Sequence, residues 1–175
     1  MGTPDELVAV FDATGSRIGA TTRADMRARS LWHAASSVLV RSGDGSRVYV
    51  HRRTETKDVF PGRYDCWAGG VLGANEEMGQ CARRELAEEL GVSGTPLVRL
   101  FDGRYESDTV RLFTTAFEVR WDGPIRHQLT EVAEGGRLDL AELRAKVANP
   151  AWPMVPDGRE LARRWLTLLD AGEFD

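Results

Sequence analysis

Residues 70–92 read GVLGANEEMGQCARRELAEELGV, and this stretch predicts more about the chain than any other. Within it, Glu85, Glu88 and Glu89 occupy positions i, i+3 and i+4, so a helix would place their carboxylates on one face. Two leucines at helical spacing would form an apolar stripe beside that face. The stretch therefore predicts a helix with an acidic side and a buried side.

The ends of this helix can also be predicted. Asn75 is a candidate N-cap, and Gly91 is the residue type that commonly ends a helix. Arg84 lies four residues before Glu88, where a guanidinium can hold a carboxylate in place. We therefore expect a helix over residues 76–90.

The acidic face predicts a metal site, because closely spaced carboxylates repel one another unless a cation neutralises them. Their oxygens suit Mg²⁺ or Mn²⁺, which bind through one or two carboxylates while waters and substrate phosphates complete the coordination. Gly69 and Gly70 permit close backbone approach, so the carbonyl of Gly70 could reach the same ion. The alternative is a solvated acidic helix whose Glu and Arg residues form ordinary surface pairs.

Composition is that of a compact enzyme domain. The chain has 175 residues, 42% apolar and 29% charged, so we expect one domain over residues 1–175. A net charge of −4 without a Lys/Arg stripe argues against nucleic acid or a membrane as partner.

Without an apolar run of roughly 20 residues or a signal-like start, a cytoplasmic location is expected. Cys66 and Cys81 form no metal-ligand pattern and are expected to be reduced and partly buried.

Strand patterns occur on both sides of the acidic helix. They cover residues 7–11, 17–21, 36–41, 47–52, 64–68, 97–102 and 109–120, with a further short one at 137–138. Further helices are predicted at 23–29, 140–148 and 158–169, with Asp139 and Asp157 as possible caps. This order predicts an α+β fold in which a mixed sheet lies between helical layers.

The same acidic stretch resembles the Nudix box, which is glycine, five residues, glutamate, seven residues, then Arg-Glu-apolar-any-Glu-Glu-any-Gly-apolar. Every specified position is matched, by Gly70, Glu76, Arg84, Glu85, Leu86, Glu88, Glu89, Gly91 and Val92. The resemblance implies an α/β/α sandwich and a Mg²⁺-dependent hydrolase, for which Mn²⁺ can substitute. Its substrate would be a small phosphorylated molecule, either a nucleoside diphosphate derivative or a nucleoside triphosphate, cleaved at a phosphoanhydride bond. A homodimer is compatible with this reading.

The resemblance also assigns roles to the residues of the box. Glu85, Glu88 and Glu89 would hold the metal together with the carbonyl of Gly70, and the first two are also catalytic candidates. Nudix hydrolases often recruit a further glutamate beyond the box, as general base or additional ligand. Glu131 is the preferred match for it, and Glu134 is the reserve candidate. Glu76, Arg84 and Gly91 are, with Gly70, the structural positions of the motif.

Three cations precede the box. Arg52, Arg53 and Lys57 lie within six residues and could clamp phosphate oxygens, or they could be surface charges with solvated heads. A similar series precedes the box in the Nudix branch that resembles isopentenyl-diphosphate isomerase. Trp32, Tyr64, Trp67 and Tyr105 are candidates to stack on a base, and core positions are the alternative.

The chemical residues of the isomerase are mostly missing. Its cysteine position is occupied here by Gly69, its histidine after the box glycine by Val71, and a metal histidine by Met26. Only His33 and Glu131 remain, so isomerase activity is not expected. A non-catalytic nucleotide-binding regulatory module is the other alternative. The intact box argues against it, because binding alone does not need three metal-positioned carboxylates.

Overall fold

The computed structural model describes residues 3–174, and its strands form a nine-stranded sheet. The strands are β1 (Leu7–Phe11), β2 (Arg17–Thr22), β3 (Trp32–Arg41), β4 (Arg47–Arg53), β5 (Tyr64–Asp65), β6 (Trp67–Ala68), β7 (Val98–Glu106), β8 (Arg111–Arg120) and β9 (Val132–Asp139). β3 and β8 run parallel along their whole length, whereas β7 pairs antiparallel with β8 and β9 pairs antiparallel with β4. The sheet is therefore mixed, as predicted.

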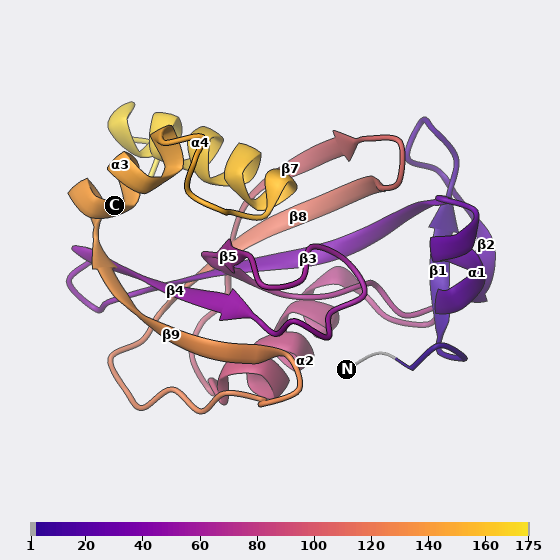
Figure 1. Ribbon diagram of the computed structural model, residues 1–175, viewed down its shortest axis with the longest axis horizontal. Helices are drawn as coiled ribbons and strands as arrows, with labels where there is room; N and C mark the ends of the chain where they lie inside the picture. Colours follow the sequence, from indigo (N-terminus) through magenta and orange to yellow (C-terminus); the bar gives the residue numbers. More distant parts are fainter. Residues whose placement is uncertain (1–2, 175) are drawn as a thin grey trace.

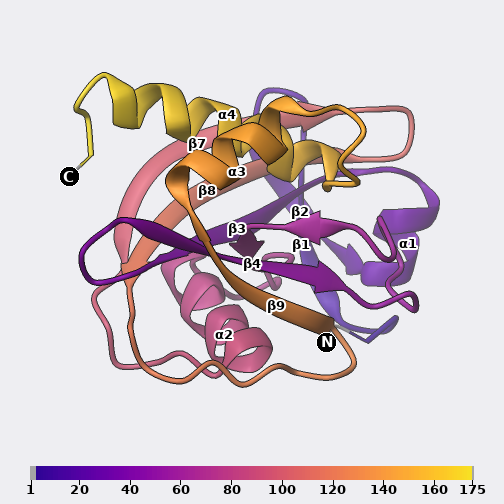
Figure 2. The ribbon, with the colours of Figure 1, turned by 60° about the vertical axis from the view of Figure 1, so that its left-hand side comes forward.

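Helices cover both faces of the sheet (Figure 1). They are α1 (Arg23–Ala28), α2 (Met78–Leu90), α3 (Leu140–Ala148) and α4 (Pro156–Asp170). α2 lies against one face, and α3 and α4 lie against the other, while β1, β2 and α1 form a unit at one end (Figure 1 and Figure 2). This arrangement confirms the predicted α/β/α sandwich. No helix within residues 3–174 is both long and apolar enough to cross a bilayer.

Alternation along β3 supplies both halves of the core. Leu39 belongs to a buried cluster with Trp165 of α4, on one face of the sheet. Val38 and Val40 point to the other face and pack in a cluster with Leu86 of α2. Each fully buried side chain of this size stabilises the fold by about 1.5–3 kcal/mol. The central strand therefore holds the two helical layers together.

The N-terminal end of α2 differs from the prediction. The helix begins at Met78, and Glu77 rather than Asn75 is the N-cap, with the Gln80 side chain accepting the Glu77 N–H at 2.9 Å. Residues 73–76 form a turn in which the Glu76 N–H bonds to the Gly73 carbonyl. This turn displaces the helix start by two residues. Gly91 ends the helix in a left-handed conformation (φ 67°), which confirms the predicted glycine stop.

Several strands extend beyond their predicted limits because pairing partners stabilise segments with weak strand propensity. β3 starts at Trp32, four residues before the predicted position 36, where it pairs with β8. β9 includes two consecutive glycines and is held by β4, although the sequence suggested only its end. The predicted strand 64–68 is divided into β5, paired with β4, and β6, paired with β3.

The last helix and the two cysteines also refine the expectations. α4 begins at Pro156, so Asp157 lies inside its first turn and is not its cap. Pro is favoured at this position because its missing N–H has no partner to lose there. Cys66 and Cys81 are both free thiols, as predicted, and both are buried.

Candidate active site

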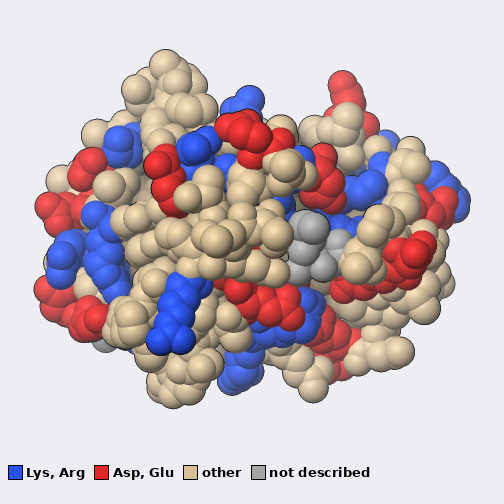
Figure 3. All heavy atoms as spheres, turned by 60° about the horizontal axis from the view of Figure 1, so that its bottom comes forward, with Lys and Arg blue, Asp and Glu red and all other residues tan. Residues whose placement is uncertain are grey.

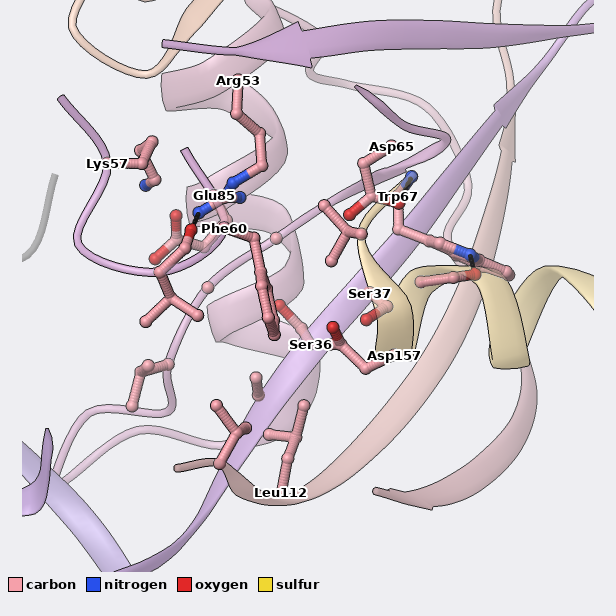
Figure 4. A pocket seen from close by; sticks show the side chains of 18 of the residues that line it. Ser36, Ser37, Arg53, Lys57, Phe60, Asp65, Trp67, Glu85, Leu112 and Asp157 are labelled. Carbon is pink, nitrogen blue, oxygen red and sulfur yellow. Dashed lines mark hydrogen bonds between the residues drawn. The ribbon is translucent and has the colours of Figure 1, made fainter. Parts of the chain in front are cut away.

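A charged cavity lies between the acidic face of α2, the loop over residues 54–62, β3 and the first turn of α4 (Figure 4). Acidic and basic side chains both line this cavity. The acidic ones are Asp58, Asp65, Glu85, Glu89, Glu131 and Asp157, and the basic ones are Arg23, Arg27, Arg53 and Lys57. Residues far apart in sequence therefore converge on one place, and we call this site the charged cavity.

Glu85 and Glu89 are the two carboxylates that α2 contributes to the charged cavity. Glu89 is 4% exposed, and one of its oxygens accepts the Gly69 N–H at 3.1 Å. Burial, with a further contribution from the charge of Glu85, raises the pKa of Glu89 to about 8. Burial also raises the pKa of Glu85, although Arg84 opposes the shift. Two neighbouring carboxylates in this environment favour a bound cation.

Glu88 does not line the charged cavity, unlike its two neighbours in the predicted set. Its side chain is 40% exposed, and an oxygen lies 3.7 Å from Arg84. The reason is helical geometry, since residues advance about 100° around the axis and Glu88 falls on the solvent side of Glu85 when Glu89 faces inward. The sequence pattern grouped the three glutamates, but the fold separates Glu88 from the other two.

Arg84 connects the turn before α2 to the acidic face. Its Nε and Nη2 donate to the two oxygens of Glu76 at 2.8 and 2.9 Å, and its Nη1 donates to Glu85 at 2.6 Å. Glu76 also accepts the Gly73 N–H at 3.1 Å. The predicted contact with Glu88 is present but longer. Arg84 therefore acts mainly as a clamp that orients Glu85, and its bidentate geometry suits that task.

Gly69 packs too tightly against backbone for any side chain, and Gly70 lies against the Glu85 carboxylate. A Cβ on Gly69 would stand 2.0 Å from the backbone oxygen of Ser36, and its φ is 158°. A Cβ on Gly70 would stand 2.3 Å from an oxygen of Glu85. The Gly70 carbonyl accepts the Ser36 N–H at 3.0 Å and the Cys81 thiol at 3.4 Å. The backbone before α2 thus lies directly against the acidic face.

Glu131 comes to the charged cavity from the segment before β9. It is 4% exposed, and its Oε2 forms an ion pair with Lys57. Its Oε1 is buried without a hydrogen-bond partner among the described residues. The reserve candidate Glu134 lies elsewhere, bound to Arg52 and to the Tyr64 hydroxyl. The structure therefore favours Glu131 as the additional glutamate.

These residues fit a hard divalent cation. Glu85 and Glu89 would hold it with the Gly70 carbonyl, and Glu131 lines the same cavity with one oxygen that has no hydrogen-bond partner among the described residues. Within residues 3–174, no three acidic, histidine or cysteine side chains lie close enough together to form a complete ligand set by themselves. A Mg²⁺ ion at this site would therefore need water and substrate phosphate to complete its shell.

The three predicted phosphate-binding cations divide into two groups. Arg53 and Lys57 line the charged cavity, where Arg53 Nη2 donates to the Val59 carbonyl at 2.9 Å and its Nε is buried without a hydrogen-bond partner among the described residues. Arg52 does not line it and instead donates to Glu134 and Glu55, each at 2.9 Å. Successive strand residues point to opposite faces, which directs Arg52 away from the site.

Two cations of the charged cavity were missed by the sequence reasoning. Arg23 and Arg27 lie one turn apart on α1 and contact Asp58 at 3.2 and 3.5 Å. Their i, i+4 spacing was the available signal. His33 lies beside them, and burial, reinforced by the charge of Arg27, lowers its pKa to about 4. It is therefore a neutral, hydrogen-bonded histidine that donates Nδ1–H to the Leu31 carbonyl at 3.0 Å.

Asp65 and Asp157 were also missed as cavity residues, and no local pattern marks either of them. Burial, together with the charge of Asp157, raises the pKa of Asp65 well above its usual range. Among the aromatic candidates, Trp67 lines the charged cavity and its Nε1–H donates to the Gly158 carbonyl at 3.0 Å. Trp32 and Tyr64 instead stack on other aromatic rings of the chain.

Comparison with known proteins supports one family. The model of the NUDIX domain matches residues 31–158. An uncharacterized Nudix hydrolase of Rhodococcus erythropolis is 48% identical over 166 residues, covering 90% of each chain. The uncharacterized Nudix hydrolase YfcD of Escherichia coli K12 is 34% identical over 161 residues, covering 92% of this chain and 87% of that protein.

Solved structures agree on the fold. DR0079 from Deinococcus radiodurans has a TM-score of 0.78 at 24% identity, covering 91% of this chain and 98% of that one. The NUDIX domain of Shewanella oneidensis NrtR, complexed with ADP ribose, has a TM-score of 0.62 at 17% identity, covering 85% and 99%. From its domain match and its relatives, the chain belongs to the Nudix hydrolase family.

Proposed function

We propose that this Nudix hydrolase uses Mg²⁺, or Mn²⁺ in its place, to cleave a phosphoanhydride bond in a nucleoside diphosphate derivative or a nucleoside triphosphate. The observation that carries the proposal is the meeting of Glu85, Glu89 and Glu131 with Arg53 and Lys57 in one cavity. When bound, the metal would polarise phosphoryl oxygens and lower the pKa of a water molecule.

The chain's own residues perform the remaining tasks. Arg53 presents a planar guanidinium to the charged cavity, where it can bind phosphate oxygens in the bidentate manner. Glu131 can accept a proton from the attacking water at its unpaired Oε1, while Lys57 holds the other oxygen and so orients the carboxylate. Glu85 is kept in position by Arg84. These side chains are therefore already oriented before substrate binds.

Local charge rather than overall charge must attract an anionic substrate. The net charge is −4, and acidic and basic side chains are interspersed on the face shown in Figure 3. The charged cavity has more acidic than basic side chains, so an anionic substrate would depend on Arg53 and Lys57 directly and on a bound cation that offsets the glutamates. The Shewanella fold neighbour with ADP ribose bound supports a nucleoside diphosphate derivative as the substrate class, because it shows that the fold accommodates such a ligand.

The isomerase alternative lacks both its residues and the space for them. No cysteine side chain fits at Gly69, because a Cβ there would collide with the Ser36 carbonyl. The similar cation series before the box therefore supports a shared framework and not a shared reaction. A regulatory module that only binds nucleotides would not need the buried glutamates and the oriented Glu131.

A substrate panel tests the proposal directly. Purified protein is incubated with nucleoside triphosphates, nucleoside diphosphates and sugar-linked nucleoside diphosphates, with Mg²⁺ or Mn²⁺, and products are identified by chromatography. We expect hydrolysis of at least one compound and its loss when a chelator removes the metal. Isopentenyl diphosphate is included, and no dimethylallyl diphosphate should form. Nucleotide binding without hydrolysis, or isomer formation, would contradict the proposal.

Arg53→Ala should raise KM by about 10- to 100-fold on any substrate found in the panel, because a charge-assisted hydrogen bond to phosphate contributes about 1.5–3 kcal/mol. Steady-state kinetics measure the effect, which should be smaller on kcat if the contact is equal in ground and transition states. Arg52→Ala is the matched control, since Arg52 points away from the charged cavity. An unchanged KM for Arg53→Ala would show that its guanidinium does not bind phosphate.

Lys57→Ala is expected to behave differently from Arg53→Ala. It removes the partner of the buried Glu131 carboxylate as well as a cation, so kcat and KM should both change. A change in KM alone would mean that the ion pair does not orient Glu131.

A further inference from the structure

The charged cavity continues beyond the phosphate-binding residues. A second hollow lies between the β7–β8 hairpin and α4, and its lining includes Tyr105 and Glu160. Both spaces are lined by Leu112, Asp157 and Leu161, so they adjoin one another at these residues. In Figure 4, Lys57 and Glu85 lie on one side of the charged cavity and Asp157 lies on the other. A substrate with phosphates at α2 would therefore direct its remaining part toward Asp157.

Asp157 carries an unmet hydrogen-bonding requirement. It belongs to the first turn of α4, and its Oδ1 is buried without a hydrogen-bond partner within residues 3–174. A buried carboxylate oxygen without a donor is costly, and such groups in native proteins require an explanation. Trp67 holds this turn in place through its bond to the Gly158 carbonyl. The carboxylate is therefore held at the boundary between the two spaces, and its Oδ1 has no hydrogen-bond donor among the described residues.

The surroundings of Asp157 are those of a site for a flat ring. Phe60 extends into the space between Glu85 and Asp157 in Figure 4. Its φ of 53° is an unusual, strained value for a residue other than glycine, and such strain is concentrated at functional sites. Leu112 adds an apolar surface from β8. Phe60 and Leu112 thus give apolar surface beside Asp157, while charged side chains also line both spaces. Pockets that orient a small ligand combine apolar walls with a few polar groups.

We propose that Asp157 is a specificity residue that accepts a hydrogen bond from the amino group of a nucleobase, with Phe60 lying against the ring. This inference rests on the proposed function and names the class of base that its substrate carries. A base with an oxo group at the same position would place a second acceptor against the carboxylate. Sites built to bond a donor reject analogues that lack it, because the buried partner is then left unpaired.

The test compares matched substrates that differ only in that group. kcat/KM is measured for cytidine and uridine forms, and for adenosine and inosine forms, of a compound that the wild type hydrolyses. We expect the amino form of one pair to be preferred at least about tenfold, the scale of one hydrogen bond to a charged group. Asp157→Asn should reduce that preference to within about twofold, because an amide can pair with either base edge. Asp108→Asn, in the exposed β7–β8 turn, is the control and should keep it.

Equal kcat/KM within both pairs, or an unchanged ratio in Asp157→Asn, would overturn the inference. If Asp157 only stabilises the N-terminal turn of α4, Asp157→Asn will have a lower Tm but the same amino-to-oxo ratio of kcat/KM as the wild type. If Asp157→Asn fails to fold, the amino-to-oxo ratio of kcat/KM in the wild type still tests whether there is any base preference. Asp157→Ser then provides a second variant for the role of Asp157.

Metal-free binding separates this inference from the proposed function. Calorimetry with the nucleoside monophosphates of both pairs measures base preference without catalysis. Amino-base preference in binding, without hydrolysis of any substrate, would refute the proposed function and support the role of Asp157. Hydrolysis without amino-base preference would support the proposed function and refute the role of Asp157. Neither binding nor hydrolysis would refute both.

Discussion

Glu85→Gln and Glu89→Gln are each expected to lower kcat by at least about 10²-fold, the smaller scale for loss of a catalytic group. Both side chains line the charged cavity, and glutamine keeps their shape while removing the charge that a divalent cation requires. Steady-state hydrolysis with saturating Mg²⁺ measures the loss. Circular dichroism should show a folded protein in both cases.

Glu88→Gln is the informative comparison within the same helix. Its side chain is 40% exposed and does not line the charged cavity, so its effect should be smaller than that of the other two. Glu142→Gln, exposed on α3, is the control and should leave kcat unchanged. Glu77 would be a poor control because it caps α2. Wild-type turnover in Glu85→Gln and Glu89→Gln would remove the assigned metal site.

Gly69→Ala should destabilise the protein by about 3 kcal/mol or more. The substitution places a methyl group 2.0 Å from the Ser36 carbonyl oxygen at a φ of 158°, and neither backbone segment can move without disturbing the sheet. Backbone strain and overpacking each cost about 1–3 kcal/mol. The free energy of unfolding from urea denaturation measures the change.

Gly136→Ala is the matched control for that experiment. Gly136 lies in β9, where a Cβ would meet nothing within 4 Å and where φ is not in the left-handed region. Alanine there should be neutral or stabilise the protein by up to about 1 kcal/mol, because it reduces the entropy of the unfolded chain. Equal unfolding midpoints for Gly69→Ala and the wild type would show that the backbone before α2 tolerates a side chain.

Local features of the fold followed from local patterns. The helical spacing within the predicted helix 76–90 indicated α2, observed over 78–90, and its inward face, because residues three and four apart lie on the same side of a helix. Gly91 marked the helix end, since it adopts φ values that other residues avoid. Asn75 was the wrong cap because Glu76 turns back to bind Arg84 eight residues later, a contact that cap propensities do not include.

Sequence alone thus determined the family, the sandwich architecture and the pairing of a carboxylate helix with cations, since these depend on periodicity and residue type. Tertiary structure decided which of these side chains line the same cavity. Lys57 pairs with Glu131 across 74 positions of the chain, and Asp157 reaches the same cavity from α4. Arg52 and Glu88 were turned outward by strand alternation and helix rotation. Such long-range contacts form because distant strands pair and bury a common core, and no short stretch of sequence contains that information.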